Sequence, residues 1–422
     1  MAHLTTLEEL RDIIMTLANI KAFNTPFVSC YLNLEHGVNR AWKKIDKRAN
    51  LLRQVLDGSD LDDFEDSIAA IECYLDEELL PEAKGLAFFA RSSFEREFYM
   101  PLQFAVPLPN RLRVYPTPNI YHLVELKDTY ERYLVMIATP DWVRILEVNL
   151  GAATIQAWSK HPPLSDRVGW EWSQTQYQLY RRDREKRFLQ EKISVLEQLM
   201  HSGDHSHLIL AGDPQITARI RHNLPETLAS NLMDVIPTTN RDAQTDIVTA
   251  TLSVFVEQEE QESQSIAARL IQAIRTQGLA VVGAENCLDN LQRGRADTLV
   301  LLQEYHPDPG WFCATCNTMG ATPLEITICP RCNSEAMRPT DLREELVRLA
   351  GKWDCPVEVV ENSDDLAALG GVGCLLRYQA DLQSGRSNDP TLEANSLITS
   401  ANARNPSRNS VISSLSSSIP IM

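Results

Sequence analysis

The chain from Val168 to Phe188 reads V-G-W-E-W-S-Q-T-Q-Y-Q-L-Y-R-R-D-R-E-K-R-F, and this stretch decides how the remaining sequence is interpreted. Ser173 followed three residues later by Gln176 is a capping-box pattern, in which two side chains satisfy free backbone groups at a helix start. The chain is expected to be helical from there to about Met200, because apolar residues recur at helical spacing. These residues are Leu189, Ile193, Leu196 and Met200.

The first half of this predicted helix differs from the second because it is basic. Its cationic residues are Arg181, Arg182, Arg184, Lys186 and Arg187. Only Tyr177, Leu179 and Tyr180 supply apolar surface there. We therefore expect a long helix that is buried at one end and basic at the other, with Gln174 in a glycine-containing loop at the basic end.

This segment resembles the central-domain loop and helix of the archaeal and eukaryotic class-1 release factors, whose Gly-Gly-Gln tip enters the ribosomal peptidyl-transferase centre. The basic run of that family is similar to Arg184–Arg187. An ungapped count back from the run places Gln174 on the catalytic glutamine, and Trp172 and Ser173 on the two glycines. The Trp-Ser-Gln tip is most similar to the bacterial branch of the superfamily, which has no established stop-codon reader. The alternative is a capped surface helix with solvated arginines.

Composition indicates a soluble protein of two or three domains, since 422 residues are many for one core. Hydrophobic residues make up 44% and charged residues 23% of the chain. No apolar run reaches the roughly 18 residues of a membrane span, and the N-terminus does not resemble a secretion signal. The nine cysteines are therefore expected in the reducing cytoplasm, where metal binding is favoured over disulfides.

The net charge of −17 argues against broad coating of nucleic acid, and we expect neither a DNA nor a membrane partner. The segment from Arg167 to Lys192 is different, because it contains seven basic and four acidic residues. An RNA-facing surface is consequently expected to be small and local.

The sequence predicts a multidomain α/β protein with three domains and a tail. Residues 1–128 form an N-terminal α/β domain, 129–276 the central domain with the glutamine loop, and 277–380 an α/β sandwich domain. Residues 381–422 are rich in Ser and Asn, without aromatics, and are predicted to be disordered.

In the first domain we expect strands at 27–34, 85–90, 98–107 and 112–115, and helices at 4–17, 42–56 and 63–80. The 42–56 helix and the turn before it are basic and either touch ribosomal RNA or form a solvated face, the commoner explanation. The Asn-Ile-Lys-Ser loop with which the eukaryotic factors read stop codons does not occur in the chain. Stop-codon decoding is therefore not expected.

In the central domain, strands at 133–138, 142–148, 152–159 and 207–211 with helices at 215–224 and 243–277 predict a mixed sheet flanked by helices. The resemblance implies an RNase-H-like topology. Gly212-Asp213-Pro214 is interpreted as a turn, because the phosphate-loop pattern is missing. His201, His205 and His207 are assigned to a solvated connector, and the acidic run 257–262 to a solvated helix face.

The third domain is predicted from strands at 279–283, 298–302 and 357–361 and helices at 288–292 and 342–353. The segment from Asn290 to Leu302 and the glycine-rich closure from Leu369 to Tyr378 are similar to the release factors' third domain. The closure glycines do not form a dinucleotide fingerprint, since no βαβ unit follows them.

Four cysteines form the strongest single motif in the chain. Cys313-Ala-Thr-Cys316 and Cys329-Pro-Arg-Cys332 are two CxxC turns separated by twelve residues, within a predicted insert at 311–334. Four thiolates form the closed tetrahedral shell of structural Zn²⁺, which leaves no position for a catalytic water. A redox pair or a degenerate ribbon is the alternative. Cys30, Cys73, Cys287, Cys355 and Cys374 are interpreted as core residues.

The resemblance implies a factor that hydrolyses peptidyl-tRNA on stalled ribosomes. It assigns catalysis to Gln174, Gly169 and Ser173, and RNA contacts to Trp170, Trp172 and the cationic residues of the helix. The expected partners are the ribosome, tRNA and a translational GTPase. The alternative is a binding scaffold without catalysis, favoured by the missing glycine pair. A nuclease would need clustered carboxylates, which the sequence does not locate.

Overall fold

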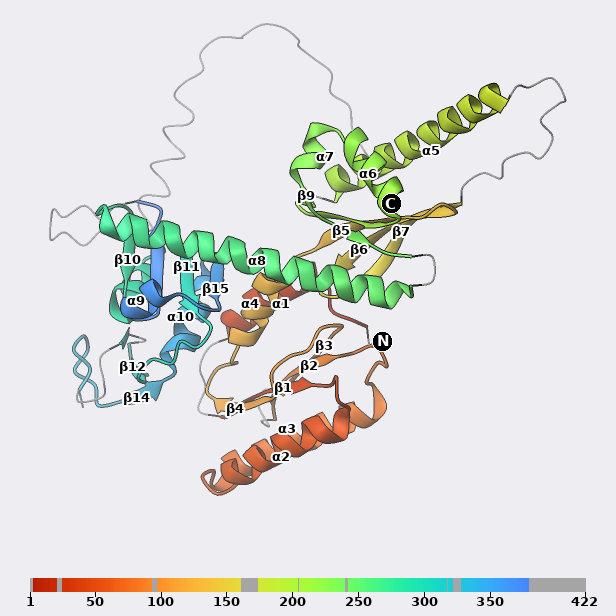
Figure 1. Ribbon diagram of the computed structural model, residues 1–422. Helices are drawn as coiled ribbons and strands as arrows, with labels where there is room; N and C mark the ends of the chain where they lie inside the picture. Colours follow the sequence, from red (N-terminus) through yellow and green to blue (C-terminus); the bar gives the residue numbers. More distant parts are fainter. Residues whose placement is uncertain are drawn as a thin grey trace, which may run out of the picture. The chain divides into compact units, whose positions relative to one another are not determined.

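The computed structural model describes residues 3–20, 25–92, 97–160, 174–203, 205–239, 242–316, 318–321 and 328–378. The chain divides into two units, Met1–Tyr378 and Gln379–Met422, and the described residues all lie in the first. Helices and sheets are combined in a mixed α/β arrangement (Figure 1), as predicted. The three-domain boundaries stay a prediction.

The first sheet has the order β3-β2-β1-β4, and all its strand pairs are antiparallel. The strands are β1 (Phe27–Asn33), β2 (Gly85–Arg91), β3 (Phe98–Phe104) and β4 (Arg111–Tyr115). Helices cover both faces, and they are α1 (Leu7–Ala18), α2 (Val38–Leu52), α3 (Gly58–Glu77) and α4 (Tyr121–Thr129). Because side chains of a strand alternate between faces, Val28 and Leu32 join the core with α2 and α3, whereas Phe27 and Tyr31 join the core with α1 and α4.

The central sheet has five strands in the order β7-β6-β5-β8-β9. They are β5 (Tyr133–Ala138), β6 (Trp142–Asn149), β7 (Ala152–Lys160), β8 (Leu208–Gly212) and β9 (Leu232–Pro237). Strand β8 pairs in parallel with β5 and β9, whereas β6 pairs antiparallel with β5 and β7. The predicted mixed sheet is therefore confirmed.

Each face of the central sheet has its own core. Leu134 and Met136 of β5 pack with α5 (Gln174–Ser202), α6 (Pro214–Asn223) and α7 (Glu226–Ser230). Tyr133 and Val135 of the same strand pack with α8 (Gln244–Arg275). Strand β5 is apolar throughout because both of its faces are covered.

The turn after β8 requires glycine. Gly212 has a φ of +138°, and a Cβ atom there would lie 1.9 Å from the carbonyl oxygen of Ala138. Asp213 then caps α6, since its carboxylate accepts the backbone N–H groups of Gln215 and Ile216, and Pro214 occupies the first turn. The interpretation of this segment as a strand-to-helix turn is confirmed.

The third sheet has the order β10-β16-β11-β15. Its strands are β10 (Ala280–Val282), β11 (Ala296–Leu302), β15 (Val357–Val360) and β16 (Val372–Leu376), and its helices are α9 (Ala284–Gln292), α10 (Leu342–Lys352) and α11 (Asp364–Ala368). A Cβ atom on Gly373 would lie 2.5 Å from Cδ2 of Leu270. Glycine at this point of the predicted closure therefore allows α8 to pack closely on β16.

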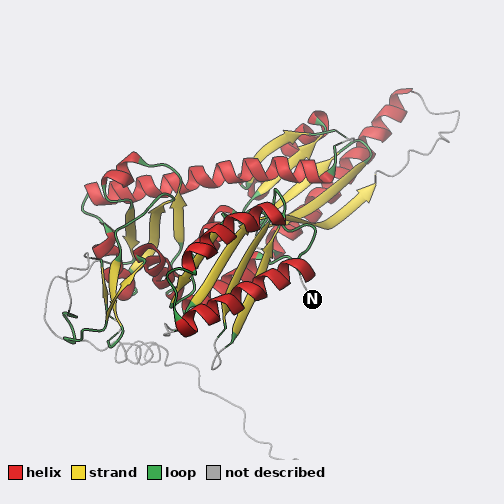
Figure 2. Cartoon of the chain, turned by 90° about the horizontal axis from the view of Figure 1, so that it is seen from below, coloured by secondary structure: helices red, strands yellow, loops and turns green. Residues whose placement is uncertain are grey.

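Between β11 and α10 lies a small sheet of the order β13-β12-β14, made of β12 (Gly310–Cys313), β13 (Met319–Gly320) and β14 (Met337–Thr340). Helix α8 is continuous over its 32 residues, as Figure 2 shows. Its first half contributes Phe255 to the central core, and its second half contributes Ala267 and Leu270 to a core with β11, β15, α11 and β16.

Several elements were not predicted: α4, α7, α11, β9 and the strands of the small sheet. Helix α2 also begins at Val38 rather than at residue 42, after Gly37, which offers no side-chain cap. Within the described part of the chain, no helix combines the length and the apolar character needed to cross a membrane.

Candidate functional site

Helix α5 is anchored through its second half. Phe188, Leu189, Ile193, Leu196 and Met200 are all buried, and they pack against β5, β6, β8, α6 and α7. The predicted apolar stripe is therefore confirmed, and Phe188 marks where burial begins.

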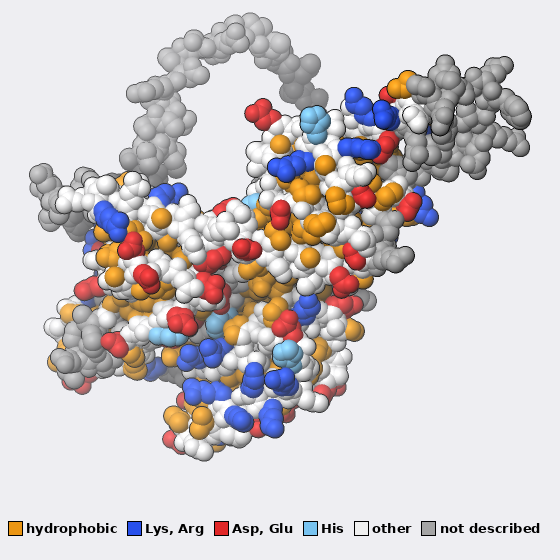
Figure 3. Space-filling view, viewed as in Figure 1, with side chains coloured by type: hydrophobic (Ala, Val, Ile, Leu, Met, Phe, Trp, Pro, Cys, Tyr) orange, Lys and Arg blue, Asp and Glu red, His pale blue; other side chains and the backbone are white. Residues whose placement is uncertain are grey.

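The first half of α5 is largely exposed where its side chains are described. Leu179 is 55% and Tyr180 43% exposed, and Arg182, Lys186 and Arg187 are exposed as well. Of the described side chains from 178 to 187, only those of Arg184 and Glu185 are half-buried, so most of this part of the helix faces solvent. Figure 3 shows Lys and Arg side chains gathered along this part of α5. Residues 174–187 thus form a basic rod of roughly 20 Å.

Most cationic side chains of the basic rod form no ion pair with a described carboxylate. No described carboxylate forms an ion pair with Arg182, Arg184, Lys186 or Arg187. The one acid in this segment with a described ion pair is Glu185, whose carboxylate lies 2.5 Å from a guanidinium nitrogen of Arg219 on α6. Arg219 therefore neutralises an acid that would otherwise offset the basic charge.

The predicted tip lies at the N-terminus of this rod. Gln174 is the first residue of α5, so the predicted helix start is correct to one residue. Gly169, Trp170, Trp172 and Ser173 lie outside the described residues, and the structure describes no side chain for Gln174 or Arg181. Their assigned roles remain predictions.

A second basic surface follows α2. Arg40, Lys43, Lys44, Lys47 and Arg48 are exposed, whereas Ala41, Ile45 and Ala49 on the opposite side are buried. Arg53 is different, because its Nε lies 2.6 Å from Oε1 of Glu65 on α3. This amphipathic pattern agrees with a solvated face, the commoner of the two explanations.

The four CxxC cysteines come together. Their sulfur atoms all lie within 4.8 Å of one another, and the Cys313–Cys332 and Cys316–Cys329 Sγ distances are both 3.5 Å. The two turns share a hydrogen-bond pattern: the N–H of Cys313 donates to the carbonyl of Thr318, and the N–H of Cys329 to that of Ser334.

This arrangement fits a tetrahedral metal. With Zn–S bonds of about 2.3 Å, sulfur atoms around one zinc ion lie about 3.8 Å apart. These four residues would hold Zn²⁺, and the ion would tie β12 to the turn before β14.

The remaining cysteines divide into two groups. Cys30, Cys287, Cys355 and Cys374 are buried, as predicted. The prediction for Cys73 is wrong, because this residue is exposed. The buried residues of α3 include Phe64, Ile68, Ile71 and Leu75, and position 73 faces away from that stripe.

The solvated interpretation of the histidine connector and of the acidic run is also wrong in part. His205 is buried, with Nε2 3.5 Å from Oε1 of Glu147 on β6. His207 is partly buried and faces Glu259 and Glu262 of α8, and the Glu259 side chain is only 14% exposed. These acids lie more than fifty residues away in sequence, so the local pattern contained no signal of the contact.

Sequence reasoning also missed a buried acid on α10. Oε2 of Glu344 accepts the N–H groups of Ile120 and Tyr121 at 2.9 and 3.2 Å, and thereby caps α4, which has no side-chain cap of its own. Arg343 lies over the Tyr121 ring at 4.0 Å. Burial and the neighbouring Asp341 raise the pKa of Glu344 to about 8.

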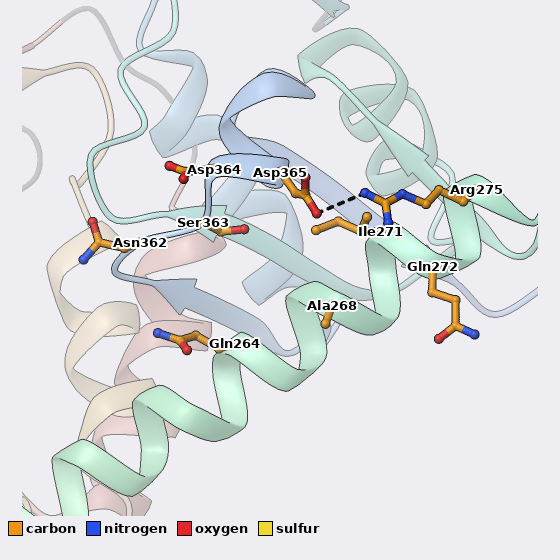
Figure 4. Close-up of a pocket in the computed structure, with 9 residues that line it drawn as sticks. All are labelled: Gln264, Ala268, Ile271, Gln272, Arg275, Asn362, Ser363, Asp364 and Asp365. Carbon is orange, nitrogen blue, oxygen red and sulfur yellow. Dashed lines mark hydrogen bonds and ion pairs between the residues drawn. The ribbon is translucent and has the colours of Figure 1, made fainter.

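A pocket of about 590 Å³ lies between α8 and the segment that leads into α11 (Figure 4). Gln264 and Ala268 line it from α8, and Asn362 and Asp364 from the other side. Arg275 and Asp365 form an ion pair of 3.1 Å at its edge. The pocket contains none of the predicted site residues.

Comparison with protein-family models gives a match over the central part of the chain. Residues 118–255 match the model described as "Bacterial archaeo-eukaryotic release factor family 10". The match includes the predicted tip and the whole of α5, and it confirms the resemblance to the bacterial branch of the release-factor superfamily. No curated protein matches the chain.

Solved structures similar to the chain include Pelota from Archaeoglobus fulgidus, with 12% identity, a TM-score of 0.36 and coverage of 90% of this chain and 95% of that one. Dom34 from S. cerevisiae, a translation termination-like factor interacting with Hbs1, has 10% identity, a TM-score of 0.36 and coverage of 71% and 81%. The archaeal translation termination factor aRF1 has 14% identity, a TM-score of 0.25 and coverage of 89% and 99%.

Proposed function

We propose, from the match of residues 118–255 to a bacterial release-factor family, that the protein hydrolyses peptidyl-tRNA on stalled ribosomes without decoding stop codons. The observation that carries the proposal is the basic rod, which begins at Gln174 and whose described side chains from 178 to 187 are exposed or half-buried. A chain with a net charge of −17 then presents cationic charge on a projecting helix. Such an element suits entry into an RNA-lined cavity.

The proposed reaction is the attack of water on the ester carbonyl that joins the nascent peptide to the tRNA ribose. The bond between the carbonyl carbon and the ribose oxygen breaks, which releases the peptide acid and a tRNA hydroxyl. Gln174 orients the water or donates its amide N–H to the developing oxyanion. Gly169 allows the tip to bend, and Ser173 caps the helix that carries Gln174.

The RNA contacts in this proposal are of two kinds. Arg181, Arg182, Arg184, Lys186 and Arg187 hold phosphate groups, which positions the tip without reading sequence. Trp170 and Trp172 stack on unpaired bases. Zn²⁺ at the four cysteines stabilises the small sheet as a zinc ribbon and takes no part in the reaction.

The finer fold predictions belong to the same proposal. We assign an RNase-H-like topology to the central domain at 129–276 and a cytoplasmic location to the protein. The disorder predicted for residues 381–422 lies outside the described residues. The third domain at 277–380 is the proposed contact for a translational GTPase, which co-purification with the full chain would test.

Peptide release from stalled ribosomes tests the reaction. Gln174→Ala is expected to slow release by about 100-fold, the effect of losing one donor to an oxyanion. Gln190→Ala is the matched control, because Gln190 is an exposed glutamine on the anchored half of the same helix. Release that is equally fast in wild type and Gln174→Ala would remove Gln174 from the chemistry.

A binding scaffold without catalysis is the second candidate. Trp172 and Ser173 stand where the catalytic family has its two glycines, and this substitution favours a tip that binds without hydrolysis. Ribosome binding by the wild-type chain without any peptide release would decide for this candidate.

A further inference from the structure

One imidazole and two carboxylates meet between β8 and α8. His207 directly precedes β8, and its carbonyl accepts the N–H of Leu134 on β5, so its backbone is fixed to the central sheet. Glu259 and Glu262 are three residues apart on α8 and therefore lie on one side of that helix. Phe255, one turn earlier, is fully buried and holds this side against the sheet through a stacked contact with Tyr133.

The spacing of these groups suits a shared ion better than direct bonds. Nε2 of His207 lies 3.9 Å from Oε1 of Glu259 and 4.0 Å from Oε1 of Glu262. Both distances are too long for a hydrogen bond. Two ligands of one metal ion, each at about 2.0–2.2 Å from it, lie about 3–4 Å apart. The other ring nitrogen, Nδ1, contacts the Ser206 hydroxyl at 2.9 Å, which orients Nε2 toward the acids.

A second observation also calls for a ligand here. Oε1 of Glu259 is completely buried and has no hydrogen-bond partner among the described residues. A buried carboxylate oxygen normally has a donor, an ion-pair partner or a metal. Three further acids contribute negative charge around it: Glu131, Glu262 and Glu358. A cation would bind this oxygen directly, since Nε2 of His207 lies 3.9 Å away, and would offset this charge.

We propose that His207, Glu259 and Glu262 bind a divalent first-row transition metal ion such as Mn²⁺ or Zn²⁺. One imidazole nitrogen with carboxylate oxygens is a ligand set that suits these ions better than the purely oxygen-binding Ca²⁺ or Mg²⁺. Three protein ligands leave at least one coordination position for water. The site differs in ligand chemistry from the four thiolates of the small sheet, so one chain would hold two metals of different preference.

The test titrates Mn²⁺ into the full chain prepared with one zinc ion per chain, which the four thiolates hold, and follows the electron paramagnetic resonance signal of the free Mn²⁺. Mn²⁺ is chosen because it favours nitrogen and oxygen ligands, whereas the thiolates retain zinc. One saturable Mn²⁺ per chain is expected. Glu262→Gln is expected to weaken the affinity at least about 10-fold, and His207→Gln similarly. Because Glu262 is half exposed, its variant keeps the fold.

Glu257→Gln is the matched control, since Glu257 is exposed on the same helix and its change removes the same charge. Its Mn²⁺ affinity should stay within about 2-fold of wild type. Equal weakening in Glu257→Gln and Glu262→Gln would mean non-specific attraction to the acidic surface and would overturn the site. Failure to find a saturable Mn²⁺ would overturn it too. Neither result bears on peptide release, because the titration contains no ribosomes.

Discussion

At the scale of single residues, Glu344 is a buried acid whose protonation should affect the stability of the fold. Its carboxylate is buried against the start of α4, and its pKa is raised to about 8 from an ordinary value of 4.5. The folded protein therefore holds a proton that the unfolded chain has already lost between these two pH values. The free energy of unfolding must therefore fall as the pH rises through this window, and the whole loss is present above pH 8.

Glu344→Gln is expected to remove this pH dependence, because the amide keeps an acceptor for the N–H groups of Ile120 and Tyr121 without ionising. Relative to the variant, the wild type should lose up to about 1.4 kcal/mol per pH unit within the window. Melting temperatures from pH 5 to 9 provide the measurement, with Glu304→Gln, an exposed acid of the third sheet region, as control. Parallel curves for wild type and Glu344→Gln would contradict the assignment.

Two leucines of α5 offer a second comparison at this scale. Leu196 is fully buried, whereas Leu179 is 55% exposed on the basic rod. Leu196→Ala leaves a cavity and is expected to cost about 2–4 kcal/mol of unfolding free energy, while Leu179→Ala should change it by less than about 0.5 kcal/mol. Denaturant unfolding measures both. Similar losses would mean that the rod is packed in solution.

At the scale of elements, the small sheet should depend on its four cysteines. Its three strands have two to four residues each, too few to be stable without a cross-link. We expect about one zinc ion per chain, and chelation should expose the amides of β12 and β14 to hydrogen exchange while β5 and β8 stay protected.

Cys329→Ser should reproduce the effect of chelation, and Cys73→Ser, at an exposed cysteine, should not. Metal analysis together with hydrogen exchange would distinguish the two variants. A full complement of zinc in Cys329→Ser would exclude the proposed ligand set.

Elements were predictable wherever the pattern was local. The apolar run of β5, the stripe of α5 and the two CxxC turns each contain their own signal within a few residues. Helical spacing on α3 also indicates that Cys73 is exposed, because position 73 lies opposite the buried residues of that helix. The contacts Glu344–Ile120 and His207–Glu259 were not predictable, because each joins residues from separate elements that only the tertiary fold brings together.

At the scale of the whole molecule, ribosome binding should depend more on where the basic residues lie than on the net charge of the chain. Arg182→Gln with Lys186→Gln, and Arg40→Gln with Lys44→Gln, remove the same charge from exposed positions on α5 and α2. We expect the α5 pair to weaken ribosome binding about 10-fold and to reduce its salt slope by about 1.5. The α2 pair should have little effect, and equal losses would favour an RNA contact on α2 as well.

The continuity of α5 has a further consequence for how the tip is aimed. Since the anchored and uncovered halves are one helix, deleting a single residue between 178 and 187 would swing Gln174 by about 100° about the helix axis while shortening the rod by only about 1.5 Å. Deleting seven residues would shorten the rod by about 10 Å but return Gln174 to within about 20° of its original direction about the helix axis. The basic rod therefore sets both the distance of Gln174 from the core and the direction in which it points. Length variants of the rod could separate these two effects.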